Sequence, residues 1–259
     1  LDTVEERADS LAIVDVDNIY TPDTENTQSV SSRNAATVKQ AVDTLKDRNI
    51  NNSYGAAYAP WVRIRDTIAQ RSLWVPPSVV ALGVLSNTDN RQGPWFAPAG
   101  FTRGGLTEGA AGVPVLDVSR KYTQDQRDDL YEANINPIAN FPNEGIVVFG
   151  QKTLQVTPSA LDRINVRRLM NFVKKEISRM ANTILFEQNV EQTWNNFLAQ
   201  VNPFLGSVKA RFGLSEFKVV LDSTTTTPEL IDRNIVYAKI FLKPTRAVEY
   251  IAIDFNITN

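Results

Sequence analysis

Apolar and polar positions in the first half of the chain predict strands and helices in turn. A short apolar run at 10–18, SLAIVDVDN, ends in acids and Asn and predicts a buried strand. Residues 31–49 follow with apolar positions at helical spacing, and Ser31 or Ser32 can cap this helix. A strand-like pattern returns at 56–66. This order of strand, helix and strand predicts an α/β domain.

The pattern continues with a helix, a long loop and a strand–helix–strand series. Pro77 near a first turn predicts a helix over 75–90. Six Gly and three Pro within 93–114 predict a long loop, which lacks the Gly-Lys-Ser/Thr ending of a phosphate-binding loop. Further elements are predicted as a strand at 115–122, a helix at 123–135 whose Thr123 and Gln126 have capping-box spacing, and a strand at 145–154.

The character of the sequence changes near residue 155. Thr157 as a cap and Pro158 at the first helical position predict a helix of about 28 residues, far longer than average. A second helix over 189–213 is expected to bend or break at Pro203. Strands are predicted at 216–222, 235–243 and 247–258. We therefore expect an α/β fold, a mixed sheet flanked by helices, divided into residues 1–155 and residues 156–259, the latter with a long helix pair and terminal strands.

The last predicted strand is strongly apolar on one face. That face carries Ile251, Ile253, Phe255 and Ile257. Such a strand either closes its own sheet or pairs with the edge of a neighbouring molecule's sheet. Periodicity does not separate these alternatives.

Composition narrows the function classes. The chain has no Cys and no His, which removes disulfides, thiolate nucleophiles, imidazole bases and His- or Cys-ligated metals. The formal net charge is −2 over 259 residues, unlike the basic excess of a dedicated nucleic-acid binder. No apolar run reaches the roughly 18 residues that span a bilayer. We expect a protein without cofactor or metal. The first residue is not Met, and a helix-like pattern runs from it, so we expect a C-terminal portion of a longer protein.

One motif is compatible with catalysis. Asp15 and Asp17 follow an apolar strand, as in phosphotransferases that use an aspartate nucleophile with Mg²⁺. Asp128 and Asp129 are conceivable further ligands. Acids at the end of a strand more often solvate a turn, and no Lys-bearing motif follows. A carboxylate-based phosphotransferase is therefore the alternative hypothesis, and a non-enzymatic protein is the expected one.

The long helix near residue 170 combines an apolar stripe with positive charge. Residues 162–182 contain six Lys or Arg and two Asp or Glu. The apolar stripe is expected to pack in the protein core, which disfavours membrane binding. DNA binding is also disfavoured, because no aromatic, Asn or Gln pattern for base recognition accompanies the charge. The side opposite the stripe is either a solvated face or a docking surface for an acidic partner. Its cations are Arg167, Arg168, Lys174, Lys175 and Arg179.

Several stretches together resemble one family. VPPSVVALGVLSNTDNRQGPWFAPAG, VFGQKTL, RRLMNFVKKEISRMANTILFEQNVEQTW and PTRAVEYIAIDFNI, in this order, resemble the tail sheath proteins of contractile-tailed bacteriophages of the T-even type. The resemblance runs from about residue 58 onward. Gln188 stands where many relatives carry Pro, and the N-terminal arm of such proteins is expected to be missing here.

The resemblance implies a structural subunit. Family members form hexameric rings stacked helically around a tail tube, and they contract to drive the tube through the host envelope. Expected partners are copies of the chain, the tail tube protein, and baseplate and terminator proteins at the sheath ends, with no nucleic acid and no membrane insertion. The expected location is the virion tail, after assembly in the host cytoplasm. The alternative that the chain comes from the sheath of a phage-derived injection machine is not excluded by the sequence.

The resemblance also gives the two sequence features expected roles. The cationic helix side, or the nearby Lys209 and Arg211, is expected to grip an acidic tube surface. The terminal strand is expected to be exchanged between subunits through residues Glu249, Ile251, Ile253, Phe255 and Ile257.

Overall fold

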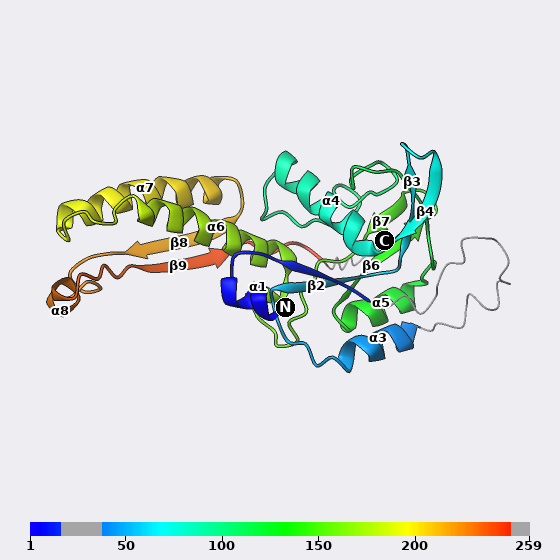
Figure 1. The fold of residues 1–259 in the computed structure, drawn as a ribbon, viewed down its shortest axis with the longest axis horizontal. Coiled ribbons are helices and arrows are strands. Elements are labelled where there is room, and N and C mark those ends of the chain that lie inside the picture. The colour runs from blue at the N-terminus through cyan, green and yellow to red at the C-terminus, as the bar shows by residue number, and fades with distance from the viewer. Residues whose placement is uncertain (17–37, 250–259) are drawn as a thin grey trace, which may run out of the picture. The chain divides into compact units, whose positions relative to one another are not determined.

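The computed structural model describes residues 1–16 and 38–249. It divides into two compact units, Leu1–Phe186 (unit 1) and Glu187–Asn259 (unit 2). The change in sequence character near residue 155 does not coincide with this division, because the helix that follows it packs into unit 1. The structure is a mixed α/β fold in which helices flank the sheets, so the predicted fold class is confirmed (Figure 1).

The centre of unit 1 is a four-stranded sheet with the order β1-β2-β6-β7. Its strands are β1 (Ala12–Asp15), β2 (Gly55–Ala59), β6 (Ile135–Phe141) and β7 (Gly145–Val148). The pairs β1–β2 and β2–β6 are parallel, whereas β6–β7 is an antiparallel pair. The predicted strand over 56–66 is in fact two strands, because the chain leaves the central sheet at Pro60 and enters a second sheet as β3 (Val62–Asp66).

Different layers cover the two faces of the central sheet. On one face, Ala57 and Ile135 pack with α3 (Val38–Lys46) and α5 (Gln124–Glu132). On the other face, Tyr58 and Ile138 pack with α4 (Pro77–Arg91) and with a three-stranded antiparallel sheet of order β4-β3-β5. The flanking strands of this second sheet are β4 (Arg71–Val75) and β5 (Val115–Val118). Alternation along β2 explains the separation, since neighbouring side chains of a strand point to opposite faces.

Local sequence signals account for several elements. Thr123 and Gln126 form the predicted capping box at the start of α5. No helix or strand forms within 93–114, as the Gly and Pro content predicts. Within α4, Gly83 lies so close to the loop that a Cβ atom there would be 2.1 Å from the carbonyl oxygen of Ala111. The missing side chain lets the helix and the loop backbone meet.

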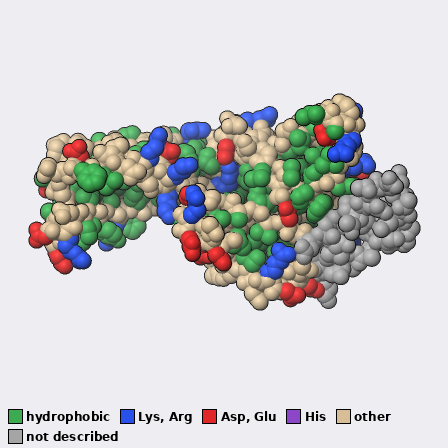
Figure 2. Space-filling view, viewed as in Figure 1, with side chains coloured by type: hydrophobic (Ala, Val, Ile, Leu, Met, Phe, Trp, Pro, Cys, Tyr) green, Lys and Arg blue, Asp and Glu red, His purple; other side chains and the backbone are tan. Residues whose placement is uncertain are grey.

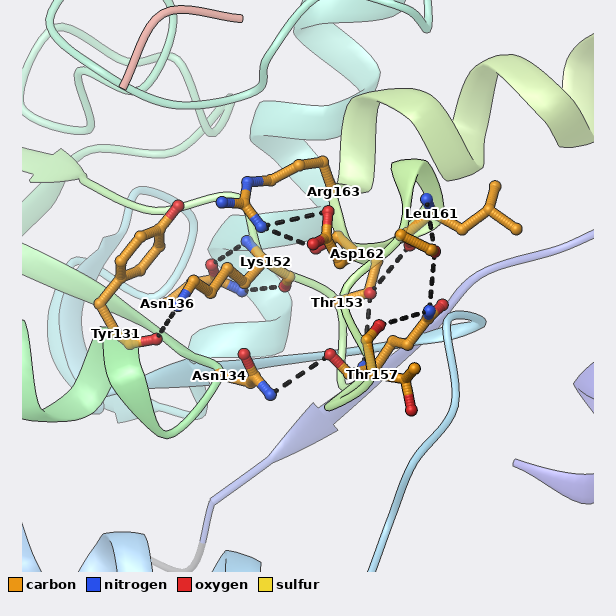
Figure 3. A network of polar contacts seen from close by, with 11 residues as sticks. Tyr131, Asn134, Asn136, Lys152, Thr153, Thr157, Leu161, Asp162 and Arg163 are labelled. Carbon is orange, nitrogen blue, oxygen red and sulfur yellow. Dashed lines mark hydrogen bonds and ion pairs between the residues drawn. The ribbon is translucent and has the colours of Figure 1, made fainter. Parts of the chain in front are cut away.

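A buried polar network holds the segment that leads into the next helix (Figure 3). The amide of Asn136, fully buried in β6, donates to the carbonyl oxygens of Ala57 (3.0 Å) and Lys152 (2.8 Å), and its oxygen accepts the N–H of Lys152 (2.6 Å). The ammonium of Lys152 donates to the carbonyl of Tyr131 at 2.7 Å and lies over that ring. Thr153 donates through its hydroxyl to the carbonyl of Leu161. The network joins three distant segments into one rigid support.

The helix predicted from Thr157 begins later than expected. Ser159 caps a short 3-10 turn, η1 (Ala160–Asp162), and α6 spans Ile164–Asn182. The prediction of a helix of about 28 residues is therefore wrong. The physical reason is tertiary pairing: Lys152 and Arg163 form a β-bridge, and the N–H of Thr153 donates to the carbonyl of Asp162, which keeps this segment extended. A short helix, α1 (Asp2–Arg7), completes unit 1.

Unit 2 contains one long helix and a two-stranded sheet. The helix α7 (Glu191–Ala210) includes Pro203 in its interior and continues through it, so the expected break is absent. Pro203 is exposed, while Val201 and Leu205 on either side are buried, and this packing offsets the lost backbone hydrogen bond. The sheet pairs β8 (Leu214–Val220) with β9 (Lys239–Pro244), and a short helix, α8 (Pro228–Asp232), lies between them in sequence. Among the described helices, none has the length and hydropathy needed to cross a membrane.

Candidate docking surface

The helix α6 is anchored in unit 1 by its first half. Its buried apolar residues fall at helical spacing, and they include Ile164, Val166, Leu169 and Val173. Beyond Val173 no residue of α6 is fully buried. The helix therefore has a fixed N-terminal half and a C-terminal half that offers more of its surface.

The structure separates Arg167 from the other cations of the predicted face. Arg167 is buried, its guanidinium donates to the hydroxyl of Ser53, and it lies 3.9 Å from the ring centroid of Tyr54. Burial lowers the pKa of this guanidinium below its usual value. The expectation that Arg167 is an exposed docking cation is wrong, because the aromatic ring of Tyr54 and the core beside it enclose the side chain. Arg167 instead ties α6 to the start of β2.

Arg168 also acts mainly within unit 1. Its side chain is 11% exposed and forms an ion pair with Asp89 of α4. Sequence reasoning missed Asp89 as the partner, and its position 79 residues earlier gives no local signal. This pair links α6 to α4 and leaves Arg168 little freedom to meet another protein.

Three predicted cations remain exposed on the second half of α6. Lys174 and Lys175 are exposed, and neither has an ion-pair partner among the described residues. Arg179 has a side chain 77% exposed and pairs with Glu176 at 2.7 Å, one turn earlier. This exposed group, Lys174, Lys175 and Arg179, is called the α6 basic patch.

Two further predicted cations belong to unit 2. Lys209 lies in the last turn of α7 and Arg211 follows that helix, and both side chains are exposed. Phe212 beside them is 73% exposed. A cation at a helix C-terminus is favoured by the helix dipole, which is a sufficient structural reason for Lys209.

The structure gives Asp15 a structural role. Its carboxylate accepts the backbone N–H of Ser78 at 3.0 Å and the Ser78 hydroxyl at 2.7 Å, which caps the first turn of α4 from a different element. Asp17 lies outside the described residues. Asp128 and Asp129 are exposed on α5, and no three His, Cys, Asp or Glu side chains gather into a metal-binding group within residues 1–16 and 38–249. The phosphotransferase alternative is not supported.

Of the predicted terminal strand, only residues 247–249 lie among the described residues. Glu249 is partly exposed and lies in neither a helix nor a strand, whereas Ile251, Ile253, Phe255 and Ile257 lie outside the described residues. The described part of unit 2 does offer unpaired edges, because β8 and β9 pair with each other and with no third strand there. A two-stranded sheet of this kind is a ready acceptor for a further strand.

Comparisons with known proteins place the chain. Residues 5–154 match the phage tail sheath protein central domain, and residues 156–258 match the phage tail sheath C-terminal domain. The chain is 36% identical over 211 residues to the tail sheath protein of Vibrio phage KVP40, covering 82% of this chain and 31% of that protein. It is also 36% identical over 210 residues to the tail sheath protein of Enterobacteria phage T4, covering 81% and 31%. The chain thus spans about a third of the length of these relatives.

The fold agrees with these sequence matches. A cryo-EM structure of the PVC sheath complex of an extracellular contractile injection system, in its contracted state, aligns with a TM-score of 0.73 and 28% identity. The alignment covers 85% of this chain and 60% of that one. The proteins of this family are structural components and not enzymes. Sequence profile, relatives and fold agree, and the chain belongs to the phage tail sheath family.

Proposed function

We propose that the full-length protein is the subunit of a contractile tail sheath. It polymerises as hexameric rings stacked around a tail tube, and the stack contracts to drive the tube through the host envelope. The observation that carries this proposal is the match of both sheath domains along nearly the whole chain. The protein works in the virion tail and is assembled in the host cytoplasm, with baseplate and terminator proteins at the two ends of the sheath.

A sheath of a phage-derived injection machine is the second candidate, favoured by the likeness to the PVC sheath complex. The identity of 36% to two phage tail sheath proteins, against 28% to that complex, supports the virion as the setting. Both settings use the same mechanical principle.

The α6 basic patch is our proposed grip on the tube. Its support is chemical: Lys174 and Lys175 are exposed ammonium groups without a described counter-ion, on a helix anchored rigidly at its other half. Exposed charge pairs are weak one by one and are screened by salt. Many such contacts together bind the extended sheath to the tube, and they dissociate when the subunits move during contraction.

Exchange of the terminal strand is our proposed link between subunits. The strand from Glu249 onward supplies main-chain hydrogen bonds to an edge of the β8–β9 sheet of a neighbouring copy. Such a link is strong along the strand, yet it lets the linked bodies rotate. Rings joined in this way stay connected during contraction.

Charge reversal in the α6 basic patch tests the grip. The full-length protein with Lys174→Glu and Lys175→Glu is expected to bind preassembled tail tubes about tenfold more weakly at low salt, because attraction to an acidic surface becomes repulsion. Co-sedimentation with tubes over a salt series measures the effect. The wild-type affinity is expected to fall as salt rises.

The matched control is Lys46→Glu with Lys121→Glu, which makes the same change of charge at two other exposed lysines of unit 1. It is expected to leave tube binding near the wild-type level. Equal tube binding by the Lys174/Lys175 variant and the wild type at every salt concentration would place the grip elsewhere on the subunit.

A further inference from the structure

The outer face of the second sheet in unit 1 carries a group of arginine and tryptophan side chains. The inward residues Val62, Ile64 and Val75 belong to the core, so alternation along the strands directs Arg63, Arg65 and Trp74 outward. Arg63 stands opposite Trp74, with its guanidinium 5.8 Å from that ring. Blue side chains mark the surface over the β3–β4 hairpin in Figure 2. We call Arg63, Arg65 and Trp74 the arginine face.

The cations of this face are accessible and only weakly paired within the chain. Arg65 is exposed, and the side chain of Arg63 is 42% exposed, so both guanidinium groups can reach another molecule. The counter-charge for Arg63 is Asp117 at 3.8 Å, a long and half-exposed pair. Guanidinium groups donate only, and they pair best with carboxylates in two-pronged geometry. The chemistry that fits this face is therefore a surface of several carboxylates.

Such a surface lies on the same unit, on the helix α5. Four carboxylates share its exposed side at spacings of three and four residues, and none has an ion-pair partner among the described residues. Like charges at this spacing repel each other along a helix. The residues are Asp125, Asp128, Asp129 and Glu132, called the acidic stripe.

The two surfaces lie on opposite sides of the central sheet. The acidic stripe is on α5, which packs with Ala57 and Ile135 on one face, whereas the arginine face belongs to the sheet that packs with Tyr58 and Ile138 on the other. In Figure 1, α5 and the β3–β4 pair flank the strand β6 on opposite sides. A surface on one side of a subunit and its complement on the other side favour a contact that repeats head to tail between copies.

We propose that the arginine face of one copy binds the acidic stripe of the next copy. This inference rests on the proposed self-assembly and names the surfaces that carry part of it. The contact is heterologous: each copy presents its arginine face to one neighbour and its acidic stripe to the other. Such contacts build closed rings or helical stacks according to the rotation between copies.

Two charge-reversed variants of the full-length protein test the contact. The first variant carries Asp128→Arg and Asp129→Arg, and the second carries Arg63→Glu and Arg65→Glu. Each alone is expected to form at least about tenfold less sedimentable polymer than the wild type, because like charges then meet at every contact. An equimolar mixture is expected to recover polymer, because each variant complements the other on both sides. A single chain carrying all four changes is expected to polymerise as well.

The controls separate this inference from the proposed function. Asp2→Lys with Glu6→Lys on α1 changes the charge of unit 1 by the same amount and is expected to polymerise normally. Thermal unfolding checks that each variant is folded, and Arg65→Glu alone replaces the double change if that variant is unfolded, since Arg65 is exposed. If each variant polymerises alone, or if the mixture does not recover polymer, the proposed contact is refuted. The proposed sheath function still stands in that case, provided that the wild type polymerises. A wild type that forms no polymer overturns both.

Discussion

Removal of residues 249–259 from the full-length protein is expected to abolish polymerisation into tubes. The proposed strand would no longer supply main-chain hydrogen bonds to the β8–β9 edge of a neighbour, and no other described element of unit 2 offers an unpaired strand with an apolar face. Polymer collected by sedimentation and viewed by negative-stain microscopy measures the effect. The loss is expected to be complete, because every subunit contact of this kind is removed at once.

A pair of single substitutions sharpens this test. Ile253→Asp places a charge on the apolar side of the strand and is expected to act like the truncation, since a charge buried in a sheet interface is strongly unfavourable. Asn256→Asp adds the same charge on the opposite side of the strand and is expected to leave assembly intact. Tubes of normal length from the truncated protein would refute strand exchange and leave the family assignment unchanged.

Gly83→Ala is expected to destabilise unit 1 by about 3 kcal/mol, although alanine is the better helix former. The new Cβ atom would stand 2.1 Å from the carbonyl oxygen and 2.6 Å from the carbonyl carbon of Ala111. Both are backbone atoms, so relief requires a shift of α4 or of the whole loop. Thermal or denaturant unfolding measures the change.

The same substitution at Gly206 in α7 is the matched control. A Cβ atom there would meet nothing within 4 Å, so Gly206→Ala is expected to stabilise its helix by about 0.5 to 1 kcal/mol. A loss of stability for Gly83→Ala together with a gain for Gly206→Ala would show that the close approach to Ala111, and not helix propensity, decides the effect at Gly83. Stabilisation by Gly83→Ala would contradict the packing of α4 against the loop.

Local patterns predicted the elements whose signals are local. The capping box of α5, the proline at the start of α4 and the glycine-rich loop follow directly from neighbouring residues. The strand β6 was missed because INPIANF contains Asn136, Pro137 and Asn140, which resemble turn residues. Asn136 is buried there because Ala57 and Lys152, distant in sequence, take all of its hydrogen bonds. Tertiary contacts decided this element.

The candidate site shows the same limit. Helical periodicity correctly identified an apolar stripe on α6 and cations beside it, but it carries no information about how deep each cation lies. Arg167 can be buried because its guanidinium hydrogen-bonds to Ser53 and packs on the ring of Tyr54. Ser53 is 114 positions away in the chain. Lys175, eight positions further along the same helix, is exposed. The order of the packed layers separates the two, and the sequence contains no local sign of it.

The acids of α5 illustrate a different limit. In the sequence, Asp128 and Asp129 are conceivable metal ligands, because a metal site needs several carboxylates close together. Their spacing with Asp125 and Glu132 describes one exposed helix side equally well. The complementary arginine face became recognisable only when the second sheet showed Arg63 and Arg65 turned away from the core. Residue spacing identifies a charged surface, whereas the three-dimensional fold is needed to identify the complementary surface.

We expect the full-length protein to assemble with copies of itself into a sheath that encloses a tube. Sedimentation velocity of the purified full-length protein over a wide range of concentrations, with electron microscopy of the same samples, tests it most directly. We expect subunits to convert into long hollow cylinders as the protein concentration rises. A particle that stays monomeric at every concentration, with tail tubes present or absent, would contradict it.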